Sequence, residues 1–202
     1  MMQKATARFA AFLFVSLSIL ISGCAGTVKN MAEVPASRVV ERPADGKAMV
    51  VFMRPSGLGF AIQSSVFEAK DGASILVGIV AAKAKVAYQV DPGKHLFMVV
   101  GESADFMNAE LLPNKTYYAL VTPRMGVWKA RFSLRALHQN ELNTSEFKGW
   151  ADGCKWIEKT PESENWAQTN MPSIQSKYTE YFAKWMSKAE AERPMLLPDD
   201  GM

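Results

Sequence analysis

Hydrophobic and polar residues alternate along most of the segment from residue 47 to residue 138. Alternation with a period of two is typical of β-strands that bury one face. The clearest example is residues 127–137, where Trp128 and Phe132 share one face and basic side chains fill the other. Each short run ends at turn residues, as at Asp91-Pro92-Gly93. This pattern predicts a mainly β fold, specifically a small antiparallel β-sandwich.

The periodicity changes after residue 138. Five side chains follow a helical spacing, which predicts a helix with one buried face: Phe147, Trp150, Ala151, Cys154 and Ile157. Thr160-Pro161 has the features of a helix start, because proline is well tolerated at the first helical position. Residues 139–202 are therefore expected to form a C-terminal α-helical extension of the sandwich.

A longer helix is expected to open at Pro172-Ser173 and to end at Arg193-Pro194, with the last residues frayed. Its apolar stripe is wide and aromatic, and consists of Ile174, Tyr178, Tyr181, Phe182, Trp185, Met186 and Ala189. We expect this stripe to pack on the protein's own sandwich. A partner groove or a membrane interface is the alternative.

The N-terminal segment has the layout of a secretory signal. Lys4 and Arg8 precede an uncharged apolar run at residues 9–21. That run is too short for a spanning helix, which needs about 20 residues, but it suits the apolar region of a signal peptide. An uncleaved N-terminal anchor helix is the alternative.

The residues that end this signal, Ile21-Ser22-Gly23-Cys24, resemble the bacterial lipobox. The resemblance implies cleavage between Gly23 and Cys24 and acylation of the Cys24 thiol. It also implies a membrane contact through that lipid. Ala25 follows where an aspartate would favour the inner membrane, so the resemblance points to the outer membrane, with the protein facing the periplasm. The expected organisation is a signal peptide at 1–23, a lipidated cysteine and tether at 24–46, the sandwich at 47–138 and the helical extension at 139–202.

Several short motifs within residues 47–138 occur in a familiar order. They are Met53-Arg54-Pro55, Asp91-Pro92-Gly93-Lys94-His95, Asn114-Lys115-Thr116-Tyr117-Tyr118, and Met125-Gly126-Val127 before Ala130-Arg131. Together they resemble the lipoprotein domain of unknown function 2846. The resemblance implies a small β-sandwich in a bacterial envelope protein and implies no reaction.

Composition and charge exclude several functional classes. Apolar residues make up 49% of the 202 residues and charged residues 21%, as in an ordinary globular protein. A formal net charge of +3 argues against a strongly basic nucleic-acid binder. Two cysteines and two histidines exclude zinc fingers and a disulfide framework. No metal, cofactor or nucleic acid is expected.

Charge is distributed unevenly along the chain. Residues 47–138 hold 11 basic and 6 acidic side chains, whereas residues 139–202 hold 7 and 11. One interpretation places the acidic helices over the basic sandwich. Another leaves a row of three cations on one strand, Lys129, Arg131 and Arg135, open to an anionic envelope glycan or lipid.

Candidate catalytic groups are few. The sequence has no G-x-S-x-G or H-E-x-x-H motif. A nucleophile pair of Cys154 with His95 or His138 is conceivable, but the apolar surroundings of Cys154 favour a buried, inert thiol. The leading hypothesis is therefore a non-catalytic envelope lipoprotein that binds or assembles with another envelope component. The alternative is an envelope hydrolase or transferase that uses Cys154 or a histidine, which would require these groups to cluster in one pocket.

Overall fold

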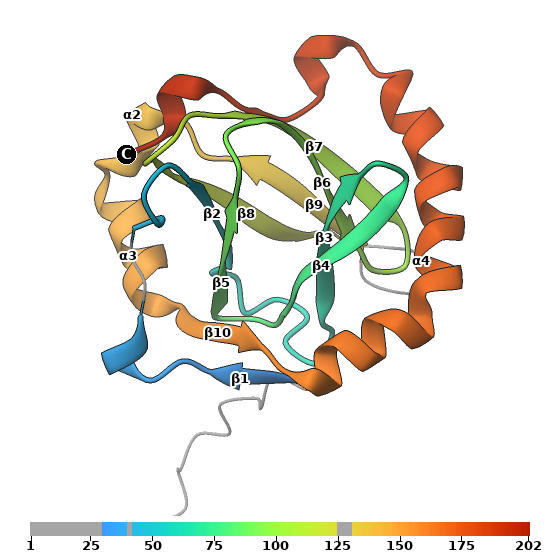
Figure 1. Cartoon of the computed structure of the whole chain (residues 1–202), viewed down its shortest axis with the longest axis horizontal. Coiled ribbons are helices and arrows are strands. Elements are labelled where there is room, and N and C mark those ends of the chain that lie inside the picture. Colours follow the sequence, from blue (N-terminus) through green and yellow to red (C-terminus); the bar gives the residue numbers. More distant parts are fainter. Residues whose placement is uncertain (1–29, 40–41, 125–130) are drawn as a thin grey trace, which may run out of the picture.

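A computed structural model describes residues 30–39, 42–124 and 131–202 as two facing sheets flanked by helices (Figure 1). The first sheet contains, in spatial order, β1 (Met31–Glu33), β10 (Lys155–Lys159), β5 (Ala84–Val90), β2 (Ala48–Arg54), β8 (Thr116–Arg124) and β9 (Arg131–Ala136). The second contains β11 (Met195–Leu196), β7 (Ala104–Leu111), β6 (Gly93–Val100), β3 (Ser64–Lys70) and β4 (Ala73–Val80). The predicted mainly β, sandwich-like fold with a C-terminal helix is confirmed.

The sheets are mixed, and the prediction of a purely antiparallel sandwich is wrong. β2 runs parallel to β8, β10 runs parallel to β5, and β11 runs parallel to β7. A parallel pair needs a crossover connection. The chain between β2 and β8 provides one, because it builds most of the second sheet before it returns. The residue pattern of one strand does not show which strand it pairs with, or whether the pair is parallel.

The main core lies between the two sheets. Phe52, Phe67 and Phe97 are fully buried there, and the rings of Phe52 and Phe97 meet edge to face. A second, smaller cluster lies on the outer face of the first sheet around Met49 and Met53. Because β2 is buried on both faces, its sequence is continuously apolar from Ala48 to Met53 rather than alternating.

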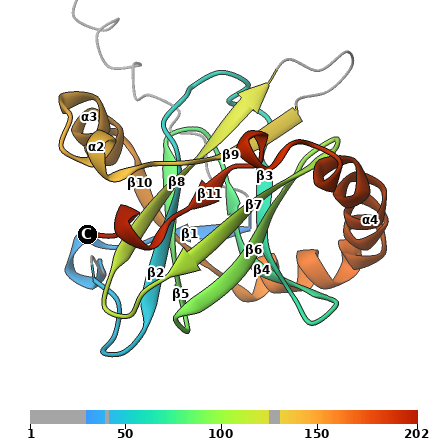
Figure 2. The same ribbon diagram turned by 90° about the horizontal axis from the view of Figure 1, so that it is seen from above.

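Short helices cover the outer cluster. They are α2 (Gln139–Leu142) and α3 (Ser145–Gly153), and they lie on the opposite side of the sandwich from the long helix α4 (Figure 2). The predicted helix face through Cys154 and Ile157 is wrong. Helix α3 ends at Gly153, and Ile157 is the buried centre of β10. Pairing with β5 and β1 decides the conformation of this segment, which local spacing cannot show.

One continuous helix, α4 (Pro161–Met186), replaces the two helices expected in this region. Thr160 caps it, because its hydroxyl oxygen accepts a hydrogen bond from the backbone N–H of Ser163. Pro172 lies inside the helix, and Figure 1 shows the helix changing direction along its length, as expected of a proline in a helix interior. The predicted end at Arg193-Pro194 is also wrong, because the helix stops at Met186.

The aromatic stripe of α4 packs on the second sheet, as expected. Phe106 of β7 contacts the rings of Tyr178, Phe182 and Trp185. Ile174 and Trp185 are buried, while Met186 remains 47% exposed at the helix end.

Both ends of the described chain join the sheets. The expected tether does not extend to residue 46, because Met31–Glu33 forms β1 against β10. The C-terminal residues are not frayed either. Leu196 is buried in β11, and the backbones of Met202 and Thr116 exchange two hydrogen bonds of 2.9 and 3.0 Å. Between α4 and the C-terminus the chain also forms two 3-10 turns, η2 (Glu190–Glu192) and η3 (Pro198–Asp200).

Candidate functional site

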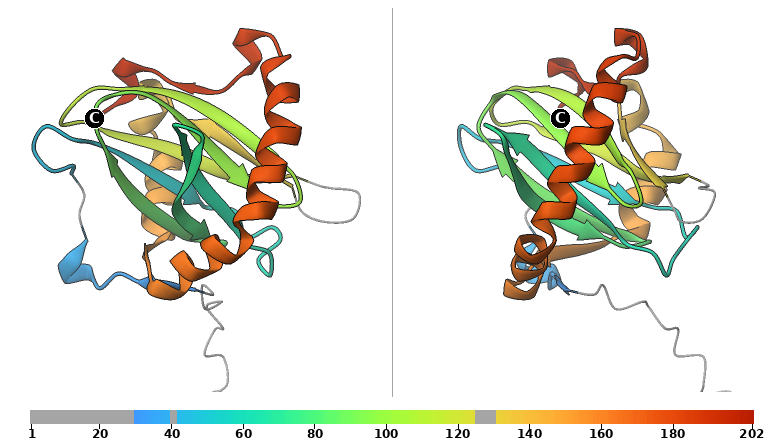
Figure 3. Two further views of the ribbon diagram at one scale, coloured as in Figure 1. Left: turned by 45° about the vertical axis from the view of Figure 1, so that its right-hand side comes forward. Right: turned by 90° about the vertical axis from the view of Figure 1, so that its right-hand side faces the viewer.

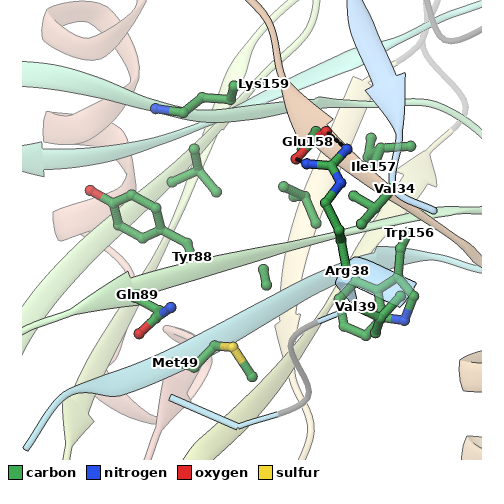
Figure 4. A pocket seen from close by; sticks show the side chains of 13 residues that line it. Val34, Arg38, Val39, Met49, Tyr88, Gln89, Trp156, Ile157, Glu158 and Lys159 are labelled. Atoms are coloured by element: carbon green, nitrogen blue, oxygen red, sulfur yellow. Dashed lines mark hydrogen bonds and ion pairs between the residues drawn. The ribbon is translucent and has the colours of Figure 1, made fainter. Parts of the chain in front are cut away.

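A cleft of about 310 Å³ opens where β10 separates from β5. β10 pairs with β5 only as far as the Ile157–Val86 step, and then the chain turns into α4. β5 continues along β2 to Val90. The 3-10 turn η1 (Ala36–Arg38) and the residues around it close one side of the cleft (Figure 4).

The interior of the cleft is mainly apolar and its edges are polar. The apolar lining comprises Val34, Val39, Met49, Val77, Val86, Ala87, Trp156 and Ile157. At one edge the guanidinium of Arg38 forms two hydrogen bonds with the Glu158 carboxylate, 2.7 and 3.2 Å long. Lys159 and Tyr88 lie along another part of the wall (Figure 4). An apolar floor with a few oriented polar groups is the common form of a ligand site.

A buried polar cluster adjoins this wall. The Tyr88 hydroxyl donates a hydrogen bond of 2.7 Å to one carboxylate oxygen of Glu68, and His95 Nδ1 lies 2.6 Å from the other. His95 Nε2 lies 2.8 Å from the carbonyl oxygen of Asp91. Burial, together with the Glu68 carboxylate, raises the pKa of Tyr88 far above its usual value.

Sequence reasoning missed this cluster. The sequence singled out His95 as a conceivable partner of Cys154, and Glu68 and Tyr88 carried no signal. They come from β3 and β5, which belong to different sheets. Only the way the two sheets face each other brings the three groups together.

Two of the three cations of the expected row, Arg131 and Arg135, are exposed on β9 and have different neighbours. Lys129 lies outside the described residues. Arg135 forms an ion pair of 2.6 Å with Glu141, and its guanidinium also lies over the Trp150 ring. Arg131 is exposed and lines a different hollow.

That second hollow measures about 290 Å³ and lies between the β8–β9 pair and the C-terminal half of α4. Four cationic side chains line it: Arg124, Arg131, Lys184 and Lys188. The acidic group at its wall is Asp105, which lies 3.8 Å from Arg124 and 3.6 Å from Lys188. The excess of positive charge in this hollow suits an anionic group. Lys184 comes from α4 and Lys188 from the residues just after it, and the strand pattern could not connect either of them to Arg131.

The enzymatic alternative requires Cys154 and a histidine in one pocket, but Cys154, His95 and His138 each have different partners. Cys154 lies in the outer apolar cluster, and burial raises the pKa of its thiol to about 11. His138 Nδ1 lies 2.9 Å from the Asp200 carboxylate. His95 belongs to the cluster with Glu68. None of the three lines the cleft. Within the described residues, no group of acidic, histidine and cysteine side chains is suited to hold a metal ion.

Gly23 and Cys24 lie outside the described residues. None of the helices in residues 30–39, 42–124 and 131–202 is long and apolar enough to cross a bilayer. No protein-family model matches the chain, and no curated protein matches it significantly.

Proposed function

We propose that this protein is a lipid-anchored lipoprotein of the bacterial cell envelope that binds a partner and catalyses no reaction. Its lipobox-like sequence Ile21-Ser22-Gly23-Cys24 supports cleavage after Gly23 and lipidation of Cys24. Ala25, in place of an aspartate, favours the outer membrane with the folded domain facing the periplasm. The likeness to the domain of unknown function 2846 supports the same compartment.

The cleft between β5 and β10 carries the proposed binding role. Its volume of about 310 Å³ reaches the range of small-ligand sites, and its interior is mainly apolar. The chemistry that fits is an apolar side chain or short acyl group with a polar end that can reach the Arg38–Glu158 pair. We propose an apolar segment of another envelope protein as the occupant.

The positions of the nucleophile and the histidines support a non-catalytic role. A thiol whose pKa is about 11 is almost entirely protonated at neutral pH, and the thiolate is the nucleophile. Cys154 also lacks a histidine among its described hydrogen-bond partners, which an activated thiol would need.

Filling the cleft tests the binding role. Ala87→Phe places a ring in the cleft, whereas Ala73→Phe makes the same change at an exposed position of the β3–β4 turn. We expect cross-linking in intact envelopes to yield a specific adduct with the wild-type protein and with Ala73→Phe. The adduct should be lost with Ala87→Phe. An adduct that survives in both variants contradicts binding in the cleft.

Removal of the lipidated thiol tests the anchoring. Cys24→Ser should leave an unprocessed precursor, or a protein that no longer partitions with detergent and membranes. Two or three acyl chains give stable anchoring, where a single chain gives only reversible binding. A processed Cys24→Ser protein that still partitions with membranes would contradict the proposal that Ile21-Ser22-Gly23-Cys24 is a lipobox. Mass spectrometry of the wild-type N-terminal peptide identifies the lipid directly.

The hollow around Arg131 supports a second ligand class, an anionic group such as a glycan or lipid phosphate. Its four cations face one carboxylate. Arg131→Gln should weaken binding of a soluble polyanion, and the wild-type affinity should fall as salt is raised. Arg135→Gln is the matched control, because Arg135 is engaged with Glu141. Equal weakening by both variants would point to a general charge effect.

A further inference from the structure

The loop between β2 and β3 exposes an uncharged apolar tip. Residues 55–63 contain no charged side chain. Leu58, Phe60 and Ile62 are 56%, 78% and 42% exposed, and Phe60 is the most exposed large hydrophobic side chain in the described part of the chain. Single exposed apolar residues are ordinary, but three on one loop mark an interaction surface.

Arg54 holds this loop in its exposed shape. Its side chain is fully buried at the end of β2 and stacks on the Phe132 ring. The guanidinium donates hydrogen bonds of 2.6 to 2.8 Å to the backbone carbonyls of Ile62, Leu58 and Gly59. The carbonyls therefore point inward to a buried cation. The loop cannot fold its apolar side chains onto the core without leaving that cation unsatisfied.

The loop lies near the place where the described chain begins. Ser64, which follows the loop, pairs with Val80, and the neighbouring N–H of Ile79 lies 3.4 Å from the Met31 sulfur. In Figures 1 and 3 the loop and β1 both lie on the lower side of the molecule. The loop therefore lies at the same end of the molecule as the start of β1.

The chain between Cys24 and β1 is short. Because Met31 is buried in the sheet, only residues 25–30 separate it from the lipidated cysteine. Fully extended, this stretch reaches about 25 Å at most. A lipid on Cys24 therefore holds the lower side of the domain close to the bilayer, within reach of a loop that projects from that side.

We propose that Leu58, Phe60 and Ile62 insert into the phospholipid leaflet that holds the acyl chains of Cys24. This inference rests on the proposed lipidation of Cys24. The exposed Lys83, whose N–H bonds to the Arg54 carbonyl at 2.8 Å, places a cation at the base of the loop, where lipid phosphates would lie. The lipid then provides the anchor, and the loop fixes the orientation of the domain on the membrane.

The test uses the full, processed protein in vesicles of phosphatidylethanolamine and phosphatidylglycerol. Ala61→Cys introduces a labelling site in the loop and keeps all three apolar side chains. Ala73→Cys is the matched control, because Ala73 is an exposed alanine at the start of β4, beside Lys70 at the far end of β3. Each cysteine carries a polarity-sensitive fluorophore, and the vesicles contain nitroxide-labelled lipid. Cys154 is buried and should remain unlabelled under native conditions.

We expect a blue-shifted emission and strong nitroxide quenching for the label at residue 61, and neither change at residue 73. Replacing Leu58, Phe60 and Ile62 together by serine should abolish the quenching, while the protein still floats with the vesicles. A floating protein whose label at residue 61 is unquenched overturns the insertion. A blue shift in detergent that depends on protein concentration also overturns the insertion, because it indicates that the loop contacts a second copy of the protein. A protein that does not float overturns the anchoring, and the insertion falls with it.

Discussion

The imidazole Nδ1 of His95 lies 2.6 Å from a carboxylate oxygen of Glu68, and both side chains are buried at one end of the sandwich. The same carboxylate accepts the hydroxyl hydrogen bond of Tyr88, whose ring lines the cleft. A carboxylate in this position is sheltered from water and satisfied by two partners. The cluster therefore ties the wall of the cleft to the second sheet, since Tyr88 belongs to β5 and the other two residues to β3 and β6.

Removing the charge at the centre of this cluster should destabilise the fold. Glu68→Gln keeps the shape of the side chain but leaves His95 and Tyr88 with a poorer acceptor. A loss of about 1–3 kcal/mol in the free energy of unfolding is expected. Urea denaturation measures it. Tyr88→Phe should cost less in the Glu68→Gln background than in the wild type, as coupled residues do. Additive effects would show that the two groups do not interact.

The same cluster makes a spectroscopic prediction. Burial and Glu68 raise the pKa of Tyr88, so this phenol should stay protonated while exposed tyrosines ionise. Alkaline absorbance titration of Glu68→Gln should show Tyr88 ionising at a lower pH than in the wild type. An unchanged titration curve would show that burial alone raises the pKa of Tyr88.

The buried thiol predicts a pH-dependent loss of stability. Burial raises the pKa of Cys154 from 9.0 to about 11, so the folded state retains the proton longer than the unfolded state. Its stabilising effect is complete below pH 9 and is lost as pH rises toward 11, by about 2 kcal/mol. Urea denaturation across this range should show a steeper fall for the wild type than for Cys154→Ala. Parallel curves would contradict the burial of the thiol, as would equally fast thiol labelling in native and denaturing buffer.

The aromatic contact between β7 and α4 should contribute strongly to stability. Phe106 is fully buried beneath three rings of the helix. Phe106→Ala should cost about 3–5 kcal/mol and make α4 more susceptible to proteolysis. Met186→Ala is the matched control, because Met186 is partly exposed at the end of the same helix and should change stability little. A helix whose proteolysis is unaffected by Phe106→Ala would not depend on this contact.

A pair of glycine substitutions tests the ordered C-terminus. At Gly201 an added Cβ would lie 2.7 Å from the Tyr117 ring and 2.8 Å from the Lys115 side chain, so Gly201→Ala should cost about 1–3 kcal/mol. At Gly149 in α3 an added Cβ would meet no atom within 4 Å beyond its chain neighbours and the backbone of its own helix, so Gly149→Ala should be neutral or stabilise the protein by up to about 1 kcal/mol. A thermal shift in opposite directions is expected. Equal melting temperatures would indicate a frayed C-terminus.

Local sequence pattern alone predicted the strands between residues 47 and 138 and the start of α4. Strands β2 to β9 all lie within residues 47–138, where alternation predicted them, because alternation and turn residues act within one strand. Thr160-Pro161 begins α4 as expected, since capping depends on neighbouring residues alone. The buried thiol of Cys154 was also predicted, although its apolar surroundings come from the outer cluster and not from the expected helix face.

Only the tertiary structure decided the features that depend on residues far apart in the chain. Strand order and the parallel pairs follow from the return of the chain to β2 after it has built the second sheet. Pairing with distant strands also placed Ile157 in a strand and Met31 in the sheet. Ile157 pairs with β5 and Met31 with β10, and these backbone hydrogen bonds outweigh local preference. The cleft, the Glu68–His95–Tyr88 cluster and the cations around Arg131 each combine side chains from separate elements. A periodic pattern predicts which face of a helix or strand is buried. It does not show which other element covers that face, because the covering element is often distant in the sequence and only the fold brings it there.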